Sequence, residues 1–286
     1  MTIAECIHFN LDKFTASEKK AAKALMQDYP FIGLENLRIY AATADVSPPT
    51  ILRMVSKLGL QGYAEFQRKL RNEVHDKLQS PLTLIDQARD ELHPNETINS
   101  FTEKFSDNLQ RTMGYLNESD IKSAIELLAE KKQRIFIVGG RFSHAIAVYL
   151  HVHLREIRDK VILLEGQSAC WPEFLIDLKK GDAFICFDMR RYQNDMLRIS
   201  RVAHSNGATI LLFTDQWMSP ISSMAKHTWC CHIDTSSPFD SYLTCVAVID
   251  FLVAQLSLHF ESDVKRRIAH LETLRENFSS DLANPL

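Results

Sequence analysis

The stretch RIFIVGGRFSHAIA, residues 134–147, is an apolar run that ends in Gly139 and Gly140 and passes directly into a helical pattern. A short apolar run closed by glycines and followed by a helix is typical of a buried strand. Similar runs follow along the chain: KVILLEG (160–166), DAFICFD (182–188), TILLFTD (209–215) and TWCCHID (228–234). Several are separated by helical patterns, and strands that alternate with helices predict an α/β doubly wound parallel sheet.

The chain before residue 130 contains helical patterns instead. Thr15 and Glu18 form a capping-box pattern that opens a helix, which Pro30 ends. Pro81 and Pro94 mark a connector. Further helical patterns cover 98–116 and 119–131, and an apolar helix covers 242–260. We therefore predict an all-α domain (residues 1–80), a helical connector (81–130), an α/β domain (131–262) and a polar tail (263–286).

The overall composition indicates a soluble, cytoplasmic protein. A hydrophobic content of 45% with 24% charged residues is ordinary for a globular chain. The net charge of −3 excludes a strongly basic coat for nucleic acid, although not a local basic patch. The six cysteines form no C-x-x-C pair, which indicates reduced thiols. The N-terminus has no signal-peptide pattern, and no apolar run is long enough to suggest a membrane span.

The all-α domain contains a helix-turn-helix pattern, LRIYAATADVSPPTILRMVSKLGLQGY (37–63). One helical pattern stops at the tight turn Asp45-Val46-Ser47 and a second begins at once. Polar residues at the start of such a second helix reach base edges, and nearby cations reach phosphates. We expect Pro49, Thr50, Arg53 and Lys57 to face outward. The candidate DNA contacts are Ser47, Pro49, Thr50, Arg53, Lys57 and Arg68. A solvated helix face remains the alternative.

The segment ADVSPPTILRMVSKLGLQGYAEFQRKL (44–70) resembles the N-terminal motif of bacterial RpiR/MurR-type transcriptional regulators. In that family, V-S-x-x-T-[VI]-x-R leads into L-G-[FL]-x-G-[FY]-x-E-[FL]. The resemblance covers most of the chain, because the family joins this domain to a C-terminal sugar-isomerase (SIS) fold. It implies a double-stranded DNA operator as partner, an SIS-like α/β domain and a small-molecule effector.

The first candidate ligand loop follows the strand at 135–139 and contains Gly140, Ser143 and His144. Free backbone N–H groups at a helix N-terminus suit a phosphate or carboxylate, and the Ser143 hydroxyl would add a donor. The alternative is a tight turn with a helix cap. The resemblance favours the ligand site, because the family's first ligand loop has the form G-x-G-x-S.

The second candidate loop, Asp188-Met189-Arg190-Arg191-Tyr192, departs from the family's S-x-S-G-x-[ST] pattern. Arg190 or Arg191 could form a bidentate pair with an anionic ligand. Alternatively, the arginines pair with local acids such as Asp188, Asp195 or Asp215 and only build the wall of the site. The expected effector is therefore a small anionic metabolite, either a sugar phosphate or a carboxylate.

Weaker candidates lie at the same predicted edge of the sheet. Thr214 ends a strand there and is a further candidate ligand contact. Trp217 is either a lid or, as we expect, part of the core. The stretch TSSPFDSY, with Ser236, Ser237 and Asp240, could complete a pocket or simply cap the following helix.

Catalysis is the main alternative function, since SIS folds also occur in isomerases. A sugar-phosphate isomerase needs a general base, and Glu165, Glu173, His144 and His151 are in the correct half of the chain without a supporting motif. The attached DNA-binding domain favours a regulator, so we expect no enzymatic activity. His144 and His151 share a helix face without an evident third ligand, so we expect no metal and no cofactor.

Helix-turn-helix proteins usually read two half-sites, which predicts a homo-oligomer, either a dimer or a tetramer. The helices at 98–131 and 242–260 are the expected surfaces of association. Effector binding would act by favouring one relative arrangement of the DNA-binding domains. No membrane partner is expected.

Overall fold

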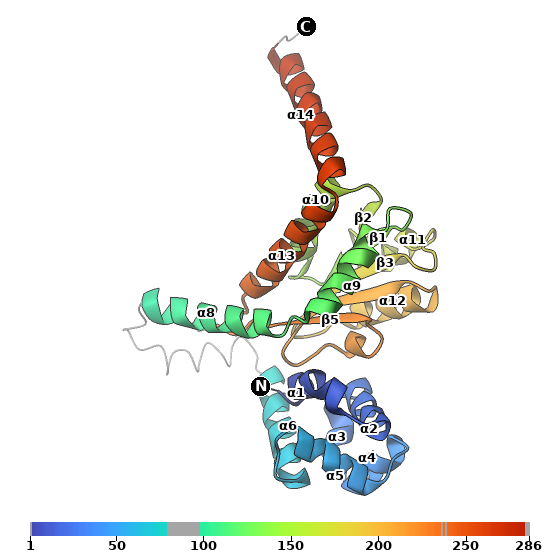
Figure 1. The fold of residues 1–286 in the computed structure, drawn as a ribbon, viewed down its shortest axis with the longest axis vertical. Helices are drawn as coiled ribbons and strands as arrows, with labels where there is room; N and C mark the ends of the chain where they lie inside the picture. Colours follow the sequence, from blue (N-terminus) through green and yellow to red (C-terminus); the bar gives the residue numbers. More distant parts are fainter. Residues whose placement is uncertain (1, 79–97, 236, 238, 284–286) are drawn as a thin grey trace.

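The computed structural model describes residues 2–78, 98–235, 237 and 239–283 (Figure 1). The predicted connector around Pro81 and Pro94 lies outside the described residues, as does Ser236. Within the described residues the chain forms an N-terminal helical domain and an α/β domain (Figure 1).

The helical domain packs around one apolar core. Its elements are α1 (Ile3–Asn10), η1 (Leu11–Lys13), α2 (Ala16–Gln27), α3 (Phe31–Leu34), α4 (Leu37–Thr43), α5 (Pro48–Lys57) and α6 (Tyr63–Leu78). The predicted capping box is confirmed: the Thr15 hydroxyl accepts from the Glu18 N–H, and the Glu18 carboxylate accepts from the Thr15 N–H. The core is formed largely by Leu25, Tyr40, Ile51, Met54, Phe66 and Leu70.

Two helices precede the sheet, close to the predicted positions. They are α8 (Ile98–Gly114) and α9 (Glu118–Ala129). Asn117 begins α9, because its side chain accepts from the backbone N–H groups of Ser119 and Asp120.

All five predicted strands are present and form one parallel sheet in the order β2-β1-β3-β4-β5. They are β1 (Ile135–Gly139), β2 (Val161–Leu163), β3 (Ala183–Phe187), β4 (Thr209–Asp215) and β5 (His227–Cys231). In the register of the sheet, Gly139 pairs with Phe187 and Phe187 pairs with Phe213. The ends of β1, β3 and β4 therefore lie next to one another, at the point where the strand order reverses.

Helices cover both faces of the sheet, which explains why the strands are apolar without alternation. The first face is covered by α9, α10 (His144–Ile157) and α13 (Leu243–His259), and Ile135 and Ile137 point toward them. Phe136 and Val138 point to the second face. That face is covered by α11 (Trp171–Phe174), which directly follows η2 (Ser168–Cys170), and by α12 (Asn194–Ser205) and η3 (Pro220–Ser223).

The segment expected as a polar tail continues as a helix, α14 (Glu261–Ala283), which extends away from the α/β domain (Figure 1). Its first turns carry ion pairs at helical spacing, including Lys265 with Glu261 at 2.6 Å. Leu271 and Leu274 line a groove shared with α10. No single helix among the described residues is long and apolar enough to cross a membrane; α13 and α14 meet that test only as a pair bent by 100°.

The helical domain contacts the α/β domain through α1 and α2. The Thr2 hydroxyl donates to the Gln216 carbonyl, with an O···O distance of 2.7 Å. Ala4 packs with Met218 and Cys230 in a small buried apolar cluster. The segment after β4 and the end of β5 therefore form the junction between the domains.

Candidate functional site

The predicted ligand residues come together at the carboxyl edge of β1, β3 and β4. Gly140 follows β1, Asp188 follows β3, and Thr214 lies near the end of β4. Adjacent parallel strands bring their carboxyl ends to the same edge, so the register of the sheet places these positions side by side. Open α/β sheets bind ligands at this edge.

In the first loop, the Ser143 side chain is held by internal hydrogen bonds. Its buried hydroxyl accepts from the Gly140 N–H at 2.9 Å and donates to the Phe187 carbonyl at 2.7 Å. These contacts join the β1–α10 turn to the end of β3. Ser143 is also the residue before α10, but its side chain makes no capping bond. His144, the first residue of α10, is half-buried.

The side chain of Gln193, just before α12, contacts the same loop, and no motif in the sequence singles this residue out. Its side-chain oxygen accepts from the Arg141 N–H at 2.8 Å. That oxygen lies only 2.4 Å from the position that a Cβ on Gly140 would take. A glycine is therefore required at position 140 for Gln193 to approach. The amide oxygen of Gln193 thus accepts from the Arg141 N–H, a backbone group of the kind that could otherwise bind a phosphate or carboxylate oxygen.

Asp188 and Thr214 form a buried network with Ser219. The Ser219 hydroxyl donates to the Asp188 carboxylate at 2.5 Å. The Thr214 hydroxyl donates to the Asp188 carbonyl and accepts from the Ser219 N–H, both at 2.9 Å. All three residues are buried. The network fixes the loop after β4 against the loop after β3.

Arg190 forms an ion pair with an acid, although not with one of the predicted acids. Its guanidinium makes two contacts with the carboxylate of Asp240, in the loop before α13. The same guanidinium lies over the Trp217 ring, 5.1 Å from its centre. Burial raises the pKa of Asp240 more than Arg190 lowers it. Trp217 is buried within the core of the α/β domain, as expected.

Arg191 is arranged differently from its neighbour. It is exposed and has a φ of 68°, in the left-handed region. Tyr192, next in the chain, turns inward, and its hydroxyl donates to the Asp215 carboxylate at 2.6 Å. The Trp217 N–H donates to the same carboxylate oxygen at 3.0 Å. The loop after β3 therefore presents one cation held by an acid, Arg190, and one exposed cation, Arg191.

The helix-turn-helix pattern is formed by α4, a turn and α5. Asp45 has a φ of 52°, which allows the tight turn between the helices. Ser47, Pro49 and Arg53 are exposed on the α5 side of this turn. Arg68, on α6, is exposed as well and lies 3.9 Å from Glu65.

Several of the predicted DNA-contacting side chains form hydrogen bonds within the helical domain, and Thr50 is buried. The expectation that Thr50 faces outward is wrong: it is only 4% exposed, because the helical turn directs it inward beside Ile51. Its hydroxyl lies 3.0 Å from the Ser47 hydroxyl and accepts from Arg53. Lys57 is partly exposed, but its ammonium group donates to the buried Glu18 carboxylate at 2.7 Å and to the Lys13 carbonyl.

Two domain families match this chain. Residues 1–77 match the helix-turn-helix domain of the rpiR family, and residues 127–256 match the SIS domain. The HTH-type transcriptional regulator HexR of Pseudomonas aeruginosa is 23% identical in an alignment that covers 96% of this chain and 95% of HexR.

Solved structures show the same fold. The sugar isomerase domain of an RpiR transcription factor from Sphaerobacter thermophilus superposes with a TM-score of 0.57 at 22% identity, covering 61% of this chain and 97% of that domain. The Vibrio vulnificus NanR protein, solved in a complex with ManNAc-6P, superposes with a TM-score of 0.52 at 15% identity. That likeness covers 95% of this chain and 98% of NanR.

Proposed function

Because the chain belongs to the RpiR family of helix-turn-helix transcriptional regulators with an SIS domain, we propose that it binds operator DNA under the control of a small anionic metabolite. The metabolite, a sugar phosphate or a carboxylate, would bind at the carboxyl edge of β1, β3 and β4. The observation that carries this proposal is the guanidinium of Arg190, which is held at that edge by Asp240 and Trp217.

The arrangement of Arg190 suits exchange between an internal and an external anion. Its two-point contact with Asp240 is the geometry with which a guanidinium also binds a phosphate or carboxylate. Burial raises the pKa of Asp240, which lowers the cost of releasing this acid as a neutral group. An anionic effector would take the place of Asp240 and release the loop before α13. The exposed Arg191 would contribute to binding by electrostatic attraction of the same anion.

The complex of NanR with ManNAc-6P supports a phosphorylated sugar as the first class to test. Gly140, Ser143, His144, Asp188 and Thr214 would shape the site around the two arginines. In this proposal Ser143, Asp188 and Thr214 hold the loops in place through internal hydrogen bonds.

A continuous chain of contacts could carry the effect to the DNA-binding domain. Arg190 lies over Trp217 on the ligand side of the loop after β4. The carbonyl of the neighbouring Gln216 accepts a hydrogen bond from the Thr2 hydroxyl, and Met218 packs against Ala4 of α1. A change at the sheet edge would therefore alter the support of α1. Such a change controls DNA binding only if the effector prefers one of the two arrangements.

On the DNA side, we propose that Ser47, Pro49 and Arg53 contact the operator directly. Arg68 would contact the phosphate backbone from the start of α6. Thr50 would support α5 from within the domain, and Lys57 would support it from the surface through Glu18. The protein would act in the cytoplasm as a homodimer or tetramer, so that two such helices read two half-sites.

Catalysis is not part of this proposal. The full-length relative HexR is a transcriptional regulator. The two glutamates considered as a general base, Glu165 and Glu173, are both exposed.

The test is a thermal-shift screen of the full chain against sugar phosphates, organic acids and amino acids. A compound that binds the folded state raises the melting temperature. We expect an anionic hit whose effect is lost in Arg190→Lys, which keeps the charge but not the two-point geometry, and is reduced in Arg191→Ala. The hit should also change the affinity for a duplex selected from a random library by the wild-type protein. A hit that is indifferent to both variants would contradict the assigned site.

A further inference from the structure

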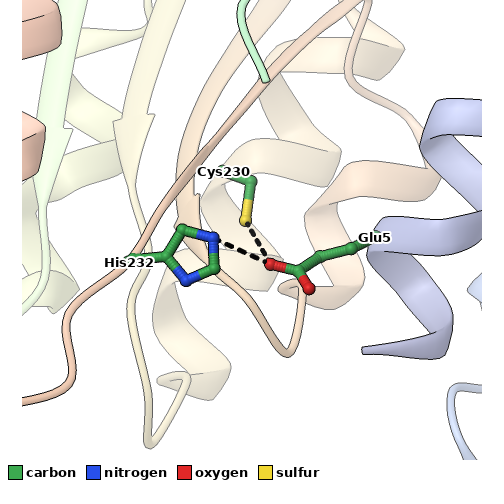
Figure 2. A group of neighbouring side chains, drawn as sticks. All are labelled: Glu5, Cys230 and His232. Carbon is green, nitrogen blue, oxygen red and sulfur yellow. Dashed lines mark hydrogen bonds and ion pairs between the residues drawn. The ribbon is translucent and has the colours of Figure 1, made fainter. Parts of the chain in front are cut away.

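Three potential metal ligands from the two domains meet at the junction: Glu5 of α1, Cys230 of β5 and His232 just beyond β5 (Figure 2). The Glu5 carboxylate oxygen Oε1 lies 3.1 Å from Nε2 of His232 and 3.8 Å from Sγ of Cys230. One donor atom from each residue lies within 4.8 Å of the others. All three side chains are buried, and Glu5 and His232 are each only 1% exposed.

These separations fit three ligands around one tetrahedral ion. Zinc binds sulfur at about 2.3 Å and nitrogen or oxygen at about 2.0–2.2 Å, which places neighbouring oxygen and nitrogen ligands about 3.3 Å apart and neighbouring oxygen and sulfur ligands about 3.6 Å apart. The distances of 3.1 and 3.8 Å from Glu5 to His232 and Cys230 are close to these values. Figure 2 shows the three donor groups directed toward a common point.

The polar groups around this point are incompletely satisfied. Nε2 of His232 lies near Glu5, but neither ring nitrogen has a hydrogen bond of acceptable geometry within the described residues. The buried hydroxyl of Tyr115 has none there either. Tyr115 borders, with Glu5 and Cys230, a cavity of about 10 Å³. That volume is about the space that one small occupant needs.

The backbone fixes His232 firmly at this point. Its N–H donates to the Thr112 hydroxyl of α8 at 2.9 Å, and its carbonyl accepts from the Thr244 hydroxyl of α13 at 2.8 Å. The Thr2 N–H donates to the second oxygen of Glu5 at 2.6 Å and thereby orients the carboxylate. Such supporting hydrogen bonds hold metal ligands in position.

We propose that Glu5, Cys230 and His232 bind one divalent transition-metal ion of the Zn²⁺ class, with Tyr115 or water as the fourth ligand. On binding, the thiol of Cys230 loses its proton to the solvent and the imidazole is neutral. The carboxylate and the thiolate together then balance the two positive charges of the ion. A mixed set of oxygen, sulfur and nitrogen ligands suits zinc better than magnesium or calcium.

The ion would join the two domains of the regulator. Glu5 belongs to the DNA-binding domain, whereas Cys230 and His232 belong to the α/β domain. Occupancy would fix α1 against the end of β5, so the availability of the metal would favour one arrangement of the DNA-binding domain. This site is separate from the proposed effector site and does not require an effector.

The test is a titration of the untagged full chain with Co²⁺, followed by absorption spectroscopy. A thiolate ligand gives a charge-transfer band in the near ultraviolet, and tetrahedral cobalt gives intense visible bands. The background variant is Cys170→Ser, because Cys170 is the exposed cysteine and could bind cobalt on its own. The site variants are Cys230→Ser and Glu5→Gln. Cys6→Ser is the matched control, because this thiol neighbours Glu5 without belonging to the cluster.

We expect the charge-transfer band at one equivalent per chain, its loss in Cys230→Ser and its retention in Cys6→Ser. Glu5→Gln should weaken Co²⁺ binding by more than about 10-fold. Zinc-edge X-ray absorption of the background protein loaded with one equivalent of Zn²⁺ should find one sulfur ligand, a result that depends on no folding-sensitive variant. A band that persists in Cys230→Ser, or zinc without a sulfur ligand, would overturn the proposal and leave a buried Glu5–His232 ion pair.

Discussion

The guanidinium of Arg190 makes two contacts with the carboxylate of Asp240 while it lies over the ring of Trp217. This arrangement joins the loop after β3, the loop after β4 and the loop before α13. The Arg190 side chain is 8% exposed and that of Asp240 is 23% exposed, so water screens the pair only partly. The pair is therefore a structural contact between these loops. In the proposed function, Arg190 is also the cation for which an anionic effector would compete with Asp240.

Removing Arg190 should destabilise the fold, because Asp240 then keeps a partly buried charge without its partner. We expect Arg190→Ala to lower the free energy of unfolding by about 1–3 kcal/mol. Urea unfolding of Arg190→Ala, Asp240→Asn and the double variant would measure the coupling. Arg191→Ala is the matched control and should change stability by no more than about 0.5 kcal/mol, because that side chain is exposed. Additive effects of the two single variants would contradict a stabilising pair.

The two adjacent glycines of the first loop should respond differently to alanine. A Cβ on Gly139 would lie 2.5 Å from the Ser143 carbonyl oxygen and 2.7 Å from the His144 nitrogen, so the backbone itself must move. We expect Gly139→Ala to cost about 1–3 kcal/mol. On Gly140 the close contact of the Cβ would be with the flexible end of Gln193, so Gly140→Ala should cost less in urea unfolding while altering the loop. Equal losses of stability would show that Gln193 cannot move aside.

The fold was predictable from the sequence because its signals are local. The central strands β1, β3 and β4 are buried on both faces along nearly their whole length, so each of them reads as a continuous apolar run. The turn after Ala44 and the capping box at Thr15 depend on residues that are close together in the chain. Such features determine the elements and their order without reference to distant residues.

The partners of the site residues were not predictable, because they come from distant segments. Arg190 pairs with Asp240, 50 residues away, and Lys57 pairs with Glu18, 39 residues away. Glu5 and Cys230 are 225 residues apart, so no motif spacing could indicate their cluster. The helix-turn-helix pattern placed α5 correctly. The inward direction of Thr50 depended on how α5 packs, which the pattern does not specify.

Arg53 and Lys57 should separate DNA contact from domain stability. Arg53 is exposed, so Arg53→Ala should weaken DNA binding and reduce the slope of log K against log salt by about 1 if the contact is to a phosphate. Lys57→Ala removes the partner of the buried Glu18 and should instead lower stability by about 1 kcal/mol. Fluorescence anisotropy at several salt concentrations, with urea unfolding of both variants, would measure these effects. The opposite pattern would show that Lys57 leaves Glu18 to contact DNA.

Glu73 of α6 should make stability depend on pH. Its carboxylate accepts from the Ile3 N–H at 2.7 Å and from the Tyr29 hydroxyl, and burial raises its pKa from 4.5 to about 6. The folded state therefore holds the proton more tightly than the unfolded state does. The stabilisation from Glu73 is fully present below pH 4.5 and is lost as the pH rises through about 6. The free energy of unfolding should fall by about 2 kcal/mol over this range. In urea unfolding between these pH values, Glu73→Gln should remove this part of the dependence of the free energy of unfolding on pH. An unchanged dependence would mean that another group is responsible for it.

The hydrogen bond from Thr2 to Gln216 should contribute to communication between the domains. Thr2→Val removes the hydroxyl that donates to the Gln216 carbonyl, whereas Thr2→Ser retains it. The compound with the largest thermal shift should change the DNA affinity of the wild-type protein and of Thr2→Ser by a similar factor. In Thr2→Val we expect this factor to fall by about 2–10-fold, equivalent to about 0.5–1.5 kcal/mol for one hydrogen bond. The measurement is DNA affinity by anisotropy with and without the compound. An equal factor in Thr2→Val would mean that the effector acts through the apolar contact of Ala4 with Met218 or through the association of subunits.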